Sequence, residues 1–239
     1  MSSGMIVNTN ISSINSQRQL TSTNNALSTT MERLSSGLRV NSAKDDAAGL
    51  AIADKMTSQI RGMTVAVRNA SDGISLAQTA EGAMGVLTST MQRMRDLSVQ
   101  SANDGAVSAS DRTKLQEEFK QLNAELTRII TNTEFNGKKI INGDLSGGVD
   151  FQVGPNTGTD NQIQVDITDL AVTIASVTGA DISGTTAANA LSAINAIDNA
   201  IENIDSSRAQ LGAVQNRFTT TIANLQSSTE NQSAARSRI

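Results

Sequence analysis

The chain has 239 residues, a formal net charge of −4 and no Cys, His, Trp or Tyr. These missing residue types exclude a disulfide framework, a thiolate nucleophile, the usual general base near neutral pH and the commonest ligands of zinc, copper and iron. The acidic balance and the lack of any aromatic residue except Phe argue against nucleic-acid binding, which depends on clustered Lys and Arg and on stacking platforms. Carboxylate sites for calcium or magnesium stay open, but we expect no cofactor.

The N-terminal segment lacks the basic and apolar regions of a cleavable secretory signal. It is rich in Asn, Ser and Thr, and Ile11 and Ile14 belong to its weakly apolar helix. A narrow apolar stripe with helical spacing follows at Leu20, Leu27, Met31, Leu34 and Leu38. A narrow stripe cannot stabilise a helix by itself, and this one has no obvious partner within the chain. We therefore predict that the segment becomes ordered when it binds a partner. Packing against other copies of the same chain is one way to bury its apolar residues.

A long second helix is predicted from residue 44 to about residue 100. Its apolar residues are spaced alternately by three and four positions, which indicates a narrow apolar seam between packed helices. They are Met56, Ile60, Met63, Val67, Ala70, Ile74, Ala77, Met84, Leu87, Met91 and Met94. At 1.5 Å per residue the helix would be on the order of 80 Å long. Ser42 with Asp45 and Asp46 predicts its start, and residues 103–105 predict a turn after its end.

The same spacing predicts two further helices, at 110–131 and 187–239. Ser110 or Asp111 is expected to cap the first of them. The seams of the first and last segments of the chain must be buried against each other, because isolated stripes do not support helices of this length. No apolar run in the chain approaches the roughly 18 residues of a membrane span, so we expect no membrane partner.

The middle of the chain, 136–177, has a different pattern. Asn-Gly and Gly-Pro turns separate the alternating runs 149–153 and 163–167, and 172–174 is a third candidate strand. Alternation between such turns predicts antiparallel hairpins. The expected fold is therefore mainly α, an elongated rod of long antiparallel coiled-coil-like helices with a small antiparallel β-hairpin region in the middle.

No catalytic motif is present. The acidic pairs Asp45-Asp46 and Glu117-Glu118 do not converge on one point, because neighbouring helical residues point about 100° apart. The methionines at 56, 63, 84, 91 and 94 have seam spacing, which favours core packing over a metal site or an adaptable partner groove. We expect a protein that is not an enzyme.

Several separated segments resemble bacterial flagellins, in the order that the family has them. They are MERLSSGLRVNSAKDDAAGLAIAD at 31–54, RNASDGISLAQTAE at 68–81, QRMRDLSVQSAND at 92–104, EFNGKKIINGD at 134–144, FQVG at 151–154, LGAVQNRFTTTIANL at 211–225 and AARSRI at 234–239. The resemblance covers the chain from Met5. It implies a structural subunit of the bacterial flagellar filament that self-assembles for motility.

The resemblance also implies a domain organisation. Residues 5–43 correspond to an N-terminal D0 helix and a connecting spoke, and residues 44–239 to the D1 rod domain, without outer domains. Family members continue beyond the last motif, so we expect the chain to lack the C-terminal D0 helix. They are exported through the flagellar type III channel without a cleaved signal peptide and are extracellular. The implied partners are other flagellin subunits together with hook-associated and cap proteins.

Flagellins of many bacteria are also bound by Toll-like receptor 5. The matching positions here are Gln92, Arg93 and Leu97 in QRMRDL and Glu118 in LQEEF. Arg93 and Leu97 are four residues apart on one helix and are expected to share a face, where an exposed Arg and a nearby Leu can anchor an interface. These positions equally suit a surface between filament subunits. Two other functions are open: a hook–filament junction protein, and a secreted coiled-coil adaptor that does not polymerise.

Overall fold

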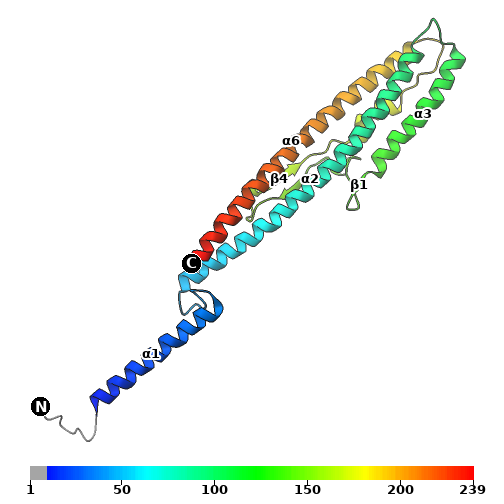
Figure 1. Cartoon of the computed structure of the whole chain (residues 1–239). Helices are drawn as coiled ribbons and strands as arrows, with labels where there is room; N and C mark the ends of the chain where they lie inside the picture. Colours follow the sequence, from blue (N-terminus) through cyan, green and yellow to red (C-terminus); the bar gives the residue numbers. More distant parts are fainter. Residues whose placement is uncertain (1–9) are drawn as a thin grey trace. The chain divides into compact units, whose positions relative to one another are not determined.

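The computed structural model describes residues 10–239, and the described chain is mainly helical. Its elements are α1 (Ile11–Ser36), α2 (Ala47–Ser101), α3 (Ala109–Asn132), β1 (Glu134–Phe135), β2 (Lys138–Lys139), β3 (Val149–Gln152), the 3-10 turn η1 (Thr159–Asn161), β4 (Gln162–Val165), α4 (Leu170–Thr173), α5 (Ala175–Thr178) and α6 (Ala188–Arg238) (Figure 1). The expected fold class, with long packed helices and a small antiparallel region in the middle of the chain, is confirmed.

The chain divides into two compact units. One is formed by residues 61–229, and the other by residues 1–60 together with 230–239. Helices α2 and α6 contribute to both units, and each unit is described by itself below. The assignment of D0 to 5–43 and D1 to 44–239 stays a prediction, and residues 5–9 of the first range lie outside the described residues.

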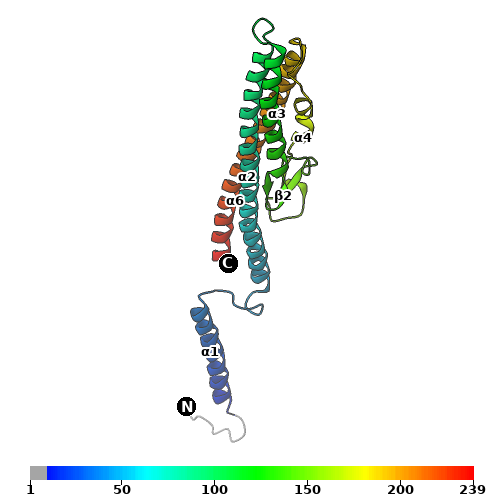
Figure 2. The ribbon, with the colours of Figure 1, turned by 90° about the vertical axis from the view of Figure 1, so that its right-hand side faces the viewer.

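In the unit 61–229, α3 and α6 lie alongside α2 and run in the opposite direction to it (Figures 1 and 2). Most buried apolar side chains of α2 follow one another at three, four or seven residues, namely Met63, Ala66, Ala70, Ala77, Ala80, Met84, Leu87, Met91 and Met94, and Leu76 and Leu97 are buried beside them. Those of α6 do the same: Ala190, Ala193, Ile197, Ala200, Ile204, Leu211, Phe218 and Leu225. The predicted apolar seam is therefore the core of this unit, and the four methionines of α2 within it are packing residues.

Phe218 joins three elements of the unit. Its ring is fully buried and meets Phe151 of β3 edge to face, with the ring centroids 5.6 Å apart. It also lies against Gly73 of α2, where an added Cβ would sit 2.6 Å from the ring atom Cζ. A glycine at this point lets the ring of α6 contact the backbone of α2, so the position has a packing reason that outweighs the poor helix propensity of glycine.

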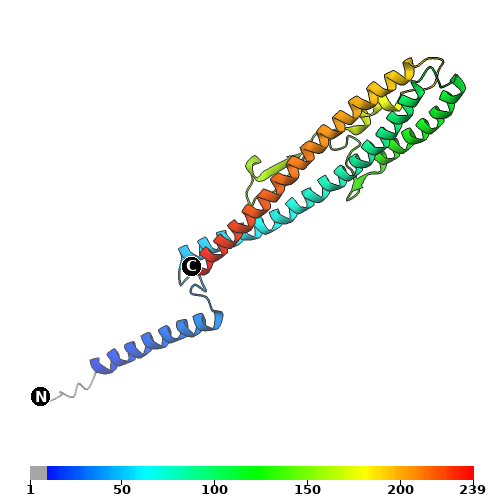
Figure 3. The same ribbon diagram turned by 45° about the horizontal axis from the view of Figure 1, so that its top comes forward.

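The segment between α3 and α6 packs beside the helices and contains two antiparallel hairpins (Figure 3). In the first, β1 pairs with β2 through Asn136 and Gly137, whose φ angles are 50° and 76°. Two consecutive positive φ angles are what a two-residue hairpin turn requires, and Asn-Gly is the preferred sequence for it. In the second, β3 pairs with β4 in a register that places Val149 opposite Val165.

The third candidate strand, 172–174, is wrong, because Leu170–Thr173 form the short helix α4. The side chain of Asp169 accepts hydrogen bonds from the backbone N–H groups of Ala171 and Val172. This capping gives hydrogen-bond partners to backbone N–H groups that have none within the first turn of a helix. The alternation of apolar residues here is too short to distinguish a strand from one helical turn.

The expected caps of α2 and α3 also differ in detail. Asp46 directly precedes α2, and its carboxylate accepts a hydrogen bond from the Gly49 N–H at 2.8 Å. For α3 the cap is neither Ser110 nor Asp111 but Ser108, whose Oγ accepts the Asp111 N–H at 3.2 Å. The Ser108 hydroxyl donates in return to the Asp111 carboxylate at 2.8 Å, and this hydrogen bond holds the pKa of Asp111 below its ordinary value.

In the other unit, α1 buries none of its residues. It ends at Gly37, which has φ 68° and donates its N–H to the Arg33 carbonyl, the usual left-handed helix ending. Beyond it, Arg39 Nε donates to the Ile239 carbonyl at 2.8 Å. The predicted pairing of Ser42 with Asp45 is present: the Ser42 hydroxyl donates to the Asp45 carboxylate at 3.0 Å and lowers the pKa of that carboxyl.

We predict that Gly73→Ala destabilises the protein by about 1–3 kcal/mol, because the added methyl group overpacks the site that the Phe218 ring occupies. Gly85→Ala is the matched control, since a Cβ there meets no heavy atom within 4 Å. Because alanine favours the interior of a helix more than glycine does, Gly85→Ala should raise the free energy of unfolding by roughly 0.5–1 kcal/mol. Denaturant unfolding followed by circular dichroism measures both changes, and equal stabilities of the two variants would contradict the packing role of Gly73.

Candidate interaction surface

Two of the predicted site residues form an ion pair that connects α2 and α3. Arg93 of α2 donates to the Glu118 carboxylate of α3, with Nη2 at 2.6 Å and Nε at 3.0 Å from Oε1. The two side chains remain 55% and 45% exposed, so both are accessible to a partner while held in one geometry. Gln92 is exposed beside Arg93. Three of the four predicted residues therefore lie on the surface of the unit 61–229.

The fourth residue, Leu97, lies elsewhere. Its side chain is only 1% exposed and belongs to the apolar core. The expectation that Leu97 accompanies Arg93 on an exposed face is wrong, because α2 packs against several elements and its buried arc is wider than one seam. Leu97 packs in the core beneath this surface and is not accessible to a partner.

A buried arginine fixes the register of α2 against α3. Arg112, near the start of α3, is 2% exposed. Its Nε donates to the Ser101 carbonyl in the last turn of α2 at 2.8 Å, and its Nη1 donates to the Gly184 carbonyl at 3.4 Å. Its Nη2 pairs with Asp104 in the turn between the helices. A cation at the C-terminus of a helix also complements the partial negative charge of the helix there.

Sequence reasoning missed Arg112, although a signal was present. The apolar spacing of α3 runs from Leu115 through Phe119, and one step of three residues back from Leu115 is Arg112. The step places a charged residue at a seam position. A buried charge needs polar partners, and the Ser101 carbonyl at the end of α2, the Gly184 carbonyl and the Asp104 carboxylate supply them. With α2 and α3 held at this point, Arg93 and Glu118 come opposite each other farther along the same pair of helices.

On its other side, α2 is linked to α6 by Arg95. Its Nε donates to the Asp198 carboxylate at 2.6 Å, and both side chains are close to half exposed. The hydrogen bond to Asp198 raises the pKa of Arg95 above its ordinary value. Arg93 and Arg95 are thus similar exposed arginines on one helix, each paired with a carboxylate of a different neighbouring helix.

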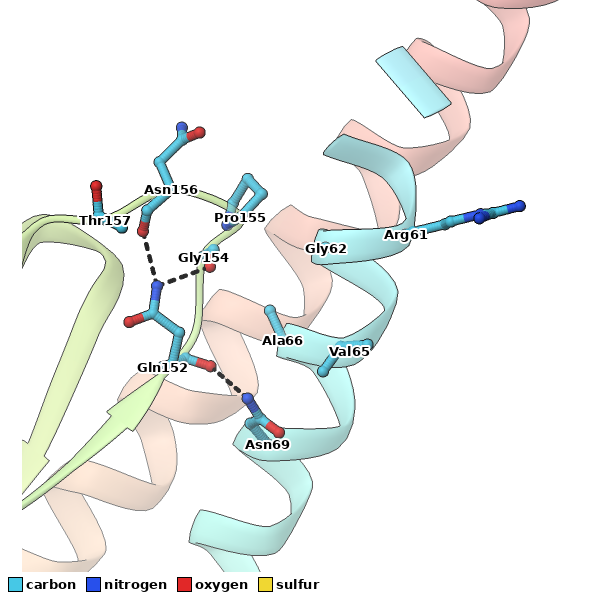
Figure 4. A pocket seen from close by; sticks show the side chains of 10 residues that line it. All are labelled: Arg61, Gly62, Val65, Ala66, Asn69, Gln152, Gly154, Pro155, Asn156 and Thr157. Atoms are coloured by element: carbon cyan, nitrogen blue, oxygen red, sulfur yellow. Dashed lines mark hydrogen bonds between the residues drawn. The ribbon is translucent and has the colours of Figure 1, made fainter. Parts of the chain in front are cut away.

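A shallow groove of about 480 Å³ lies between α2 and the loop that follows β3 (Figure 4). The loop is anchored by two amides: Asn69 Nδ2 donates to the Gln152 carbonyl at 2.9 Å, and Gln152 Nε2 donates to the Gly154 and Asn156 carbonyls at 2.9 and 2.8 Å. Arg61 is the only charged residue among those that line the groove, and its side chain points away from the loop. The groove is lined by no carboxylate and otherwise by small, apolar, amide and hydroxyl side chains.

The other candidate surface is the apolar stripe of α1, which belongs to the second unit. Four large apolar side chains lie on one face of this helix and are strongly exposed: Leu20 64%, Leu27 58%, Met31 60% and Leu34 78%. Exposed apolar side chains that form a continuous stripe on one helix are characteristic of an interaction surface rather than of a solvated one.

Other kinds of site find little support within residues 10–239. No group of three or more His, Cys, Asp or Glu side chains there could hold a metal ion. In the same part of the chain, no helix combines the length and the apolar character that crossing a membrane requires.

Comparisons with known proteins agree on one family. The description "Bacterial flagellin N-terminal helical region" matches residues 7–146, and "Bacterial flagellin C-terminal helical region" matches residues 194–239. A flagellin of Halalkalibacterium halodurans is 46% identical over 235 residues, which cover 98% of this chain and 85% of that one. The C-terminal match extends to residue 239 and gives no support to the expectation that a C-terminal D0 helix is lacking.

Solved structures share the fold. The crystal structure of Bacillus cereus flagellin has a TM-score of 0.57 and 28% sequence identity, and the match covers 71% of this chain and 94% of that one. A flagellar hook-associated protein from Vibrio parahaemolyticus has a TM-score of 0.68 at 13% identity, covering 83% of this chain and all of that one. At 13% identity the second similarity shows the fold alone.

We predict that Arg112→Met lowers the free energy of unfolding by about 2 kcal/mol, because the carbonyls that Arg112 contacts lose a charged donor in a buried place. Arg128→Met is the control. Arg128 is paired with Glu125 within α3 and is 62% exposed, so its loss should cost less than about 1 kcal/mol. Denaturant unfolding measures both variants, and a loss for Arg112→Met no larger than that of the control would show that the buried contacts do not fix the register.

Proposed function

The chain belongs to the bacterial flagellin family, and we propose that its subunits pack against one another through the exposed apolar stripe of α1. Flagellins are structural, non-enzymatic subunits of the extracellular flagellar filament, which serves motility, and membership implies polymerisation with other flagellin subunits. The observation that carries the proposal is the stripe itself, a helix of 26 residues that buries none of them. In this proposal residues 5–43 act as D0 and residues 44–239 as D1.

The stripe supports assembly for an energetic reason. An isolated helix with one narrow apolar face gains little from folding, whereas contact with another copy removes that face from water at roughly 25 cal/mol per Å². The contact must be between different surfaces of the two copies, because contact between identical patches closes a dimer while a head-to-tail contact extends into a filament. The unit 61–229 has its own core and supplies a folded body for each subunit.

Assembly is tested with Leu34→Asp, which places a charge on the stripe. We expect this variant to lose elongation from short filament seeds, because a charge without a partner is costly in a buried apolar contact. Asn25→Asp is the matched control, since it adds the same charge to the opposite face of α1. Electron microscopy gives filament lengths, and circular dichroism shows whether both variants stay folded. Equal elongation by the two variants would contradict the role of the stripe.

We propose further that Toll-like receptor 5 binds the surface formed by Gln92, Arg93 and Glu118. Support comes from the resemblance of QRMRDL and LQEEF to the matching flagellin segments and from the geometry of the pair. An arginine held by a carboxylate but more than half exposed keeps several N–H donors free for a partner. Arginine is also enriched among the residues that dominate binding energies at interfaces.

The expected result for Arg93→Ala is a loss of receptor activation of about tenfold or more, as for a side chain central to an interface. Stability should change by less than about 1 kcal/mol, because the pair is exposed. Arg95→Ala is the control, since Arg95 lies two residues away and pairs with Asp198 of α6 instead. Reporter cells carrying the receptor measure activation. If Arg93→Ala activates them as the unchanged protein does, or if Arg95→Ala loses as much, this surface is not the receptor site.

Hook-associated and cap proteins are proposed as further partners, because subunits of a flagellar filament meet these proteins at its ends. The similarity to the hook-associated protein of Vibrio parahaemolyticus is one of fold alone and does not favour the alternative of a hook–filament junction protein. The much higher identity to a flagellin over nearly the whole chain favours the filament subunit. Immunogold labelling decides between them, since a filament subunit labels the whole filament and a junction protein labels one end. A chain that never elongates a seed would favour the adaptor.

A further inference from the structure

The methionines of the chain differ sharply in exposure. In the unit 61–229, Met63 is 3% exposed, and Met84, Met91 and Met94 are 0% exposed. In the other unit Met56 is partly buried, while the side chain of Met31 on α1 is 60% exposed. Among residues 10–239, Met31 is thus the most exposed methionine.

Exposure matters because the thioether sulfur is a nucleophile toward two-electron oxidants. Its lone pair attacks one oxygen of hydrogen peroxide, an S–O bond forms as the O–O bond breaks, and a proton moves to the departing hydroxide. The sulfur is oxidised to the sulfoxide and the peroxide is reduced to water. A sulfur in a packed core is reached only after local opening of the structure, whereas Met31 reacts from the folded state.

The position of Met31 gives this chemistry a consequence. Leu27 and Leu34 lie about one turn away on either side and are 58% and 78% exposed, so Met31 is in the middle of the apolar stripe. Oxidation changes a flexible apolar side chain into a polar one, which disrupts interfaces that contain methionine, and reductases of methionine sulfoxide reverse it. We propose that Met31 is a reversible oxidation site through which peroxide-class oxidants reduce the ability of α1 to pack against another subunit.

The part of this inference that concerns assembly rests on the proposed role of the stripe, while the selectivity of oxidation does not. Selectivity is tested first. The soluble chain is treated with dilute hydrogen peroxide, and peptide mass spectrometry follows each methionine with time. Met31 should be converted about tenfold faster than Met63, Met84, Met91 and Met94, whose sulfurs depend on local opening. Conversion of Met31 at the rate of these four would overturn the proposal.

Assembly is then compared for untreated and oxidised subunits added to short filament seeds. Oxidised subunits should elongate about tenfold more slowly, the factor expected when the burial of one methionine side chain is lost. Treatment with methionine sulfoxide reductase should restore the rate. Met31→Leu keeps an apolar side chain in the stripe, and its elongation should be insensitive to peroxide.

Each outcome has one meaning. If untreated subunits fail to elongate seeds, the proposed role of the stripe fails. If untreated and oxidised subunits elongate equally, the stripe can still mediate assembly and the oxidation site is refuted. If Met31→Leu loses elongation after peroxide as much as the unchanged chain does, another methionine is responsible and the assignment to Met31 is wrong.

Discussion

The close approach of α2 and α6 is the constraint on which the rest of the unit 61–229 depends. The buried faces of the two helices contain several methyl-sized side chains: Ala70, Ala77, Ala80, Ala193 and Ala200, each nearly or fully buried. Small side chains favour close packing of helices, and Gly73 allows the ring of Phe218 from α6 to contact the backbone of α2. Phe151 then packs on that ring and positions the second hairpin, so the β-region depends on a feature of the helices.

The sequence predicts those parts of the fold that repeat. Spacings of three and four residues identify α2, α3 and α6, because one side of each helix faces the same neighbours over its length. The Asn136-Gly137 turn is identified because few residues other than Gly and Asn accept a positive φ. The burial of Leu97 escapes such reasoning, since it depends on how many elements surround α2. The cap of α3 escapes it too, because several polar residues near its start could serve equally well.

The candidate surface shows a related division between what can be predicted and what cannot. The resemblance of two short motifs brings Arg93 and Glu118 to attention, but their pairing across two helices depends on Arg112, which no motif contains. The exposed pair itself contributes little to stability. The buried contacts of Arg112 that align it cannot be replaced without leaving buried polar groups unpaired. Residues that face a partner can therefore vary while the alignment beneath them is retained. This separation suits a structural protein whose function is distributed over surfaces rather than concentrated in a pocket.

The ending of α1 at Gly37 has a further consequence for how a subunit meets its neighbours. Gly37 adopts a left-handed conformation, and no heavy atom would touch a Cβ placed there. The direction in which the chain leaves α1 is set by the torsion angles of Gly37 and by two hydrogen bonds back to the helix, from the Leu38 N–H to Ser36 Oγ and from Asn41 Nδ2 to Glu32 Oε1. Turning the helix toward a docking surface changes a few backbone angles and breaks no core.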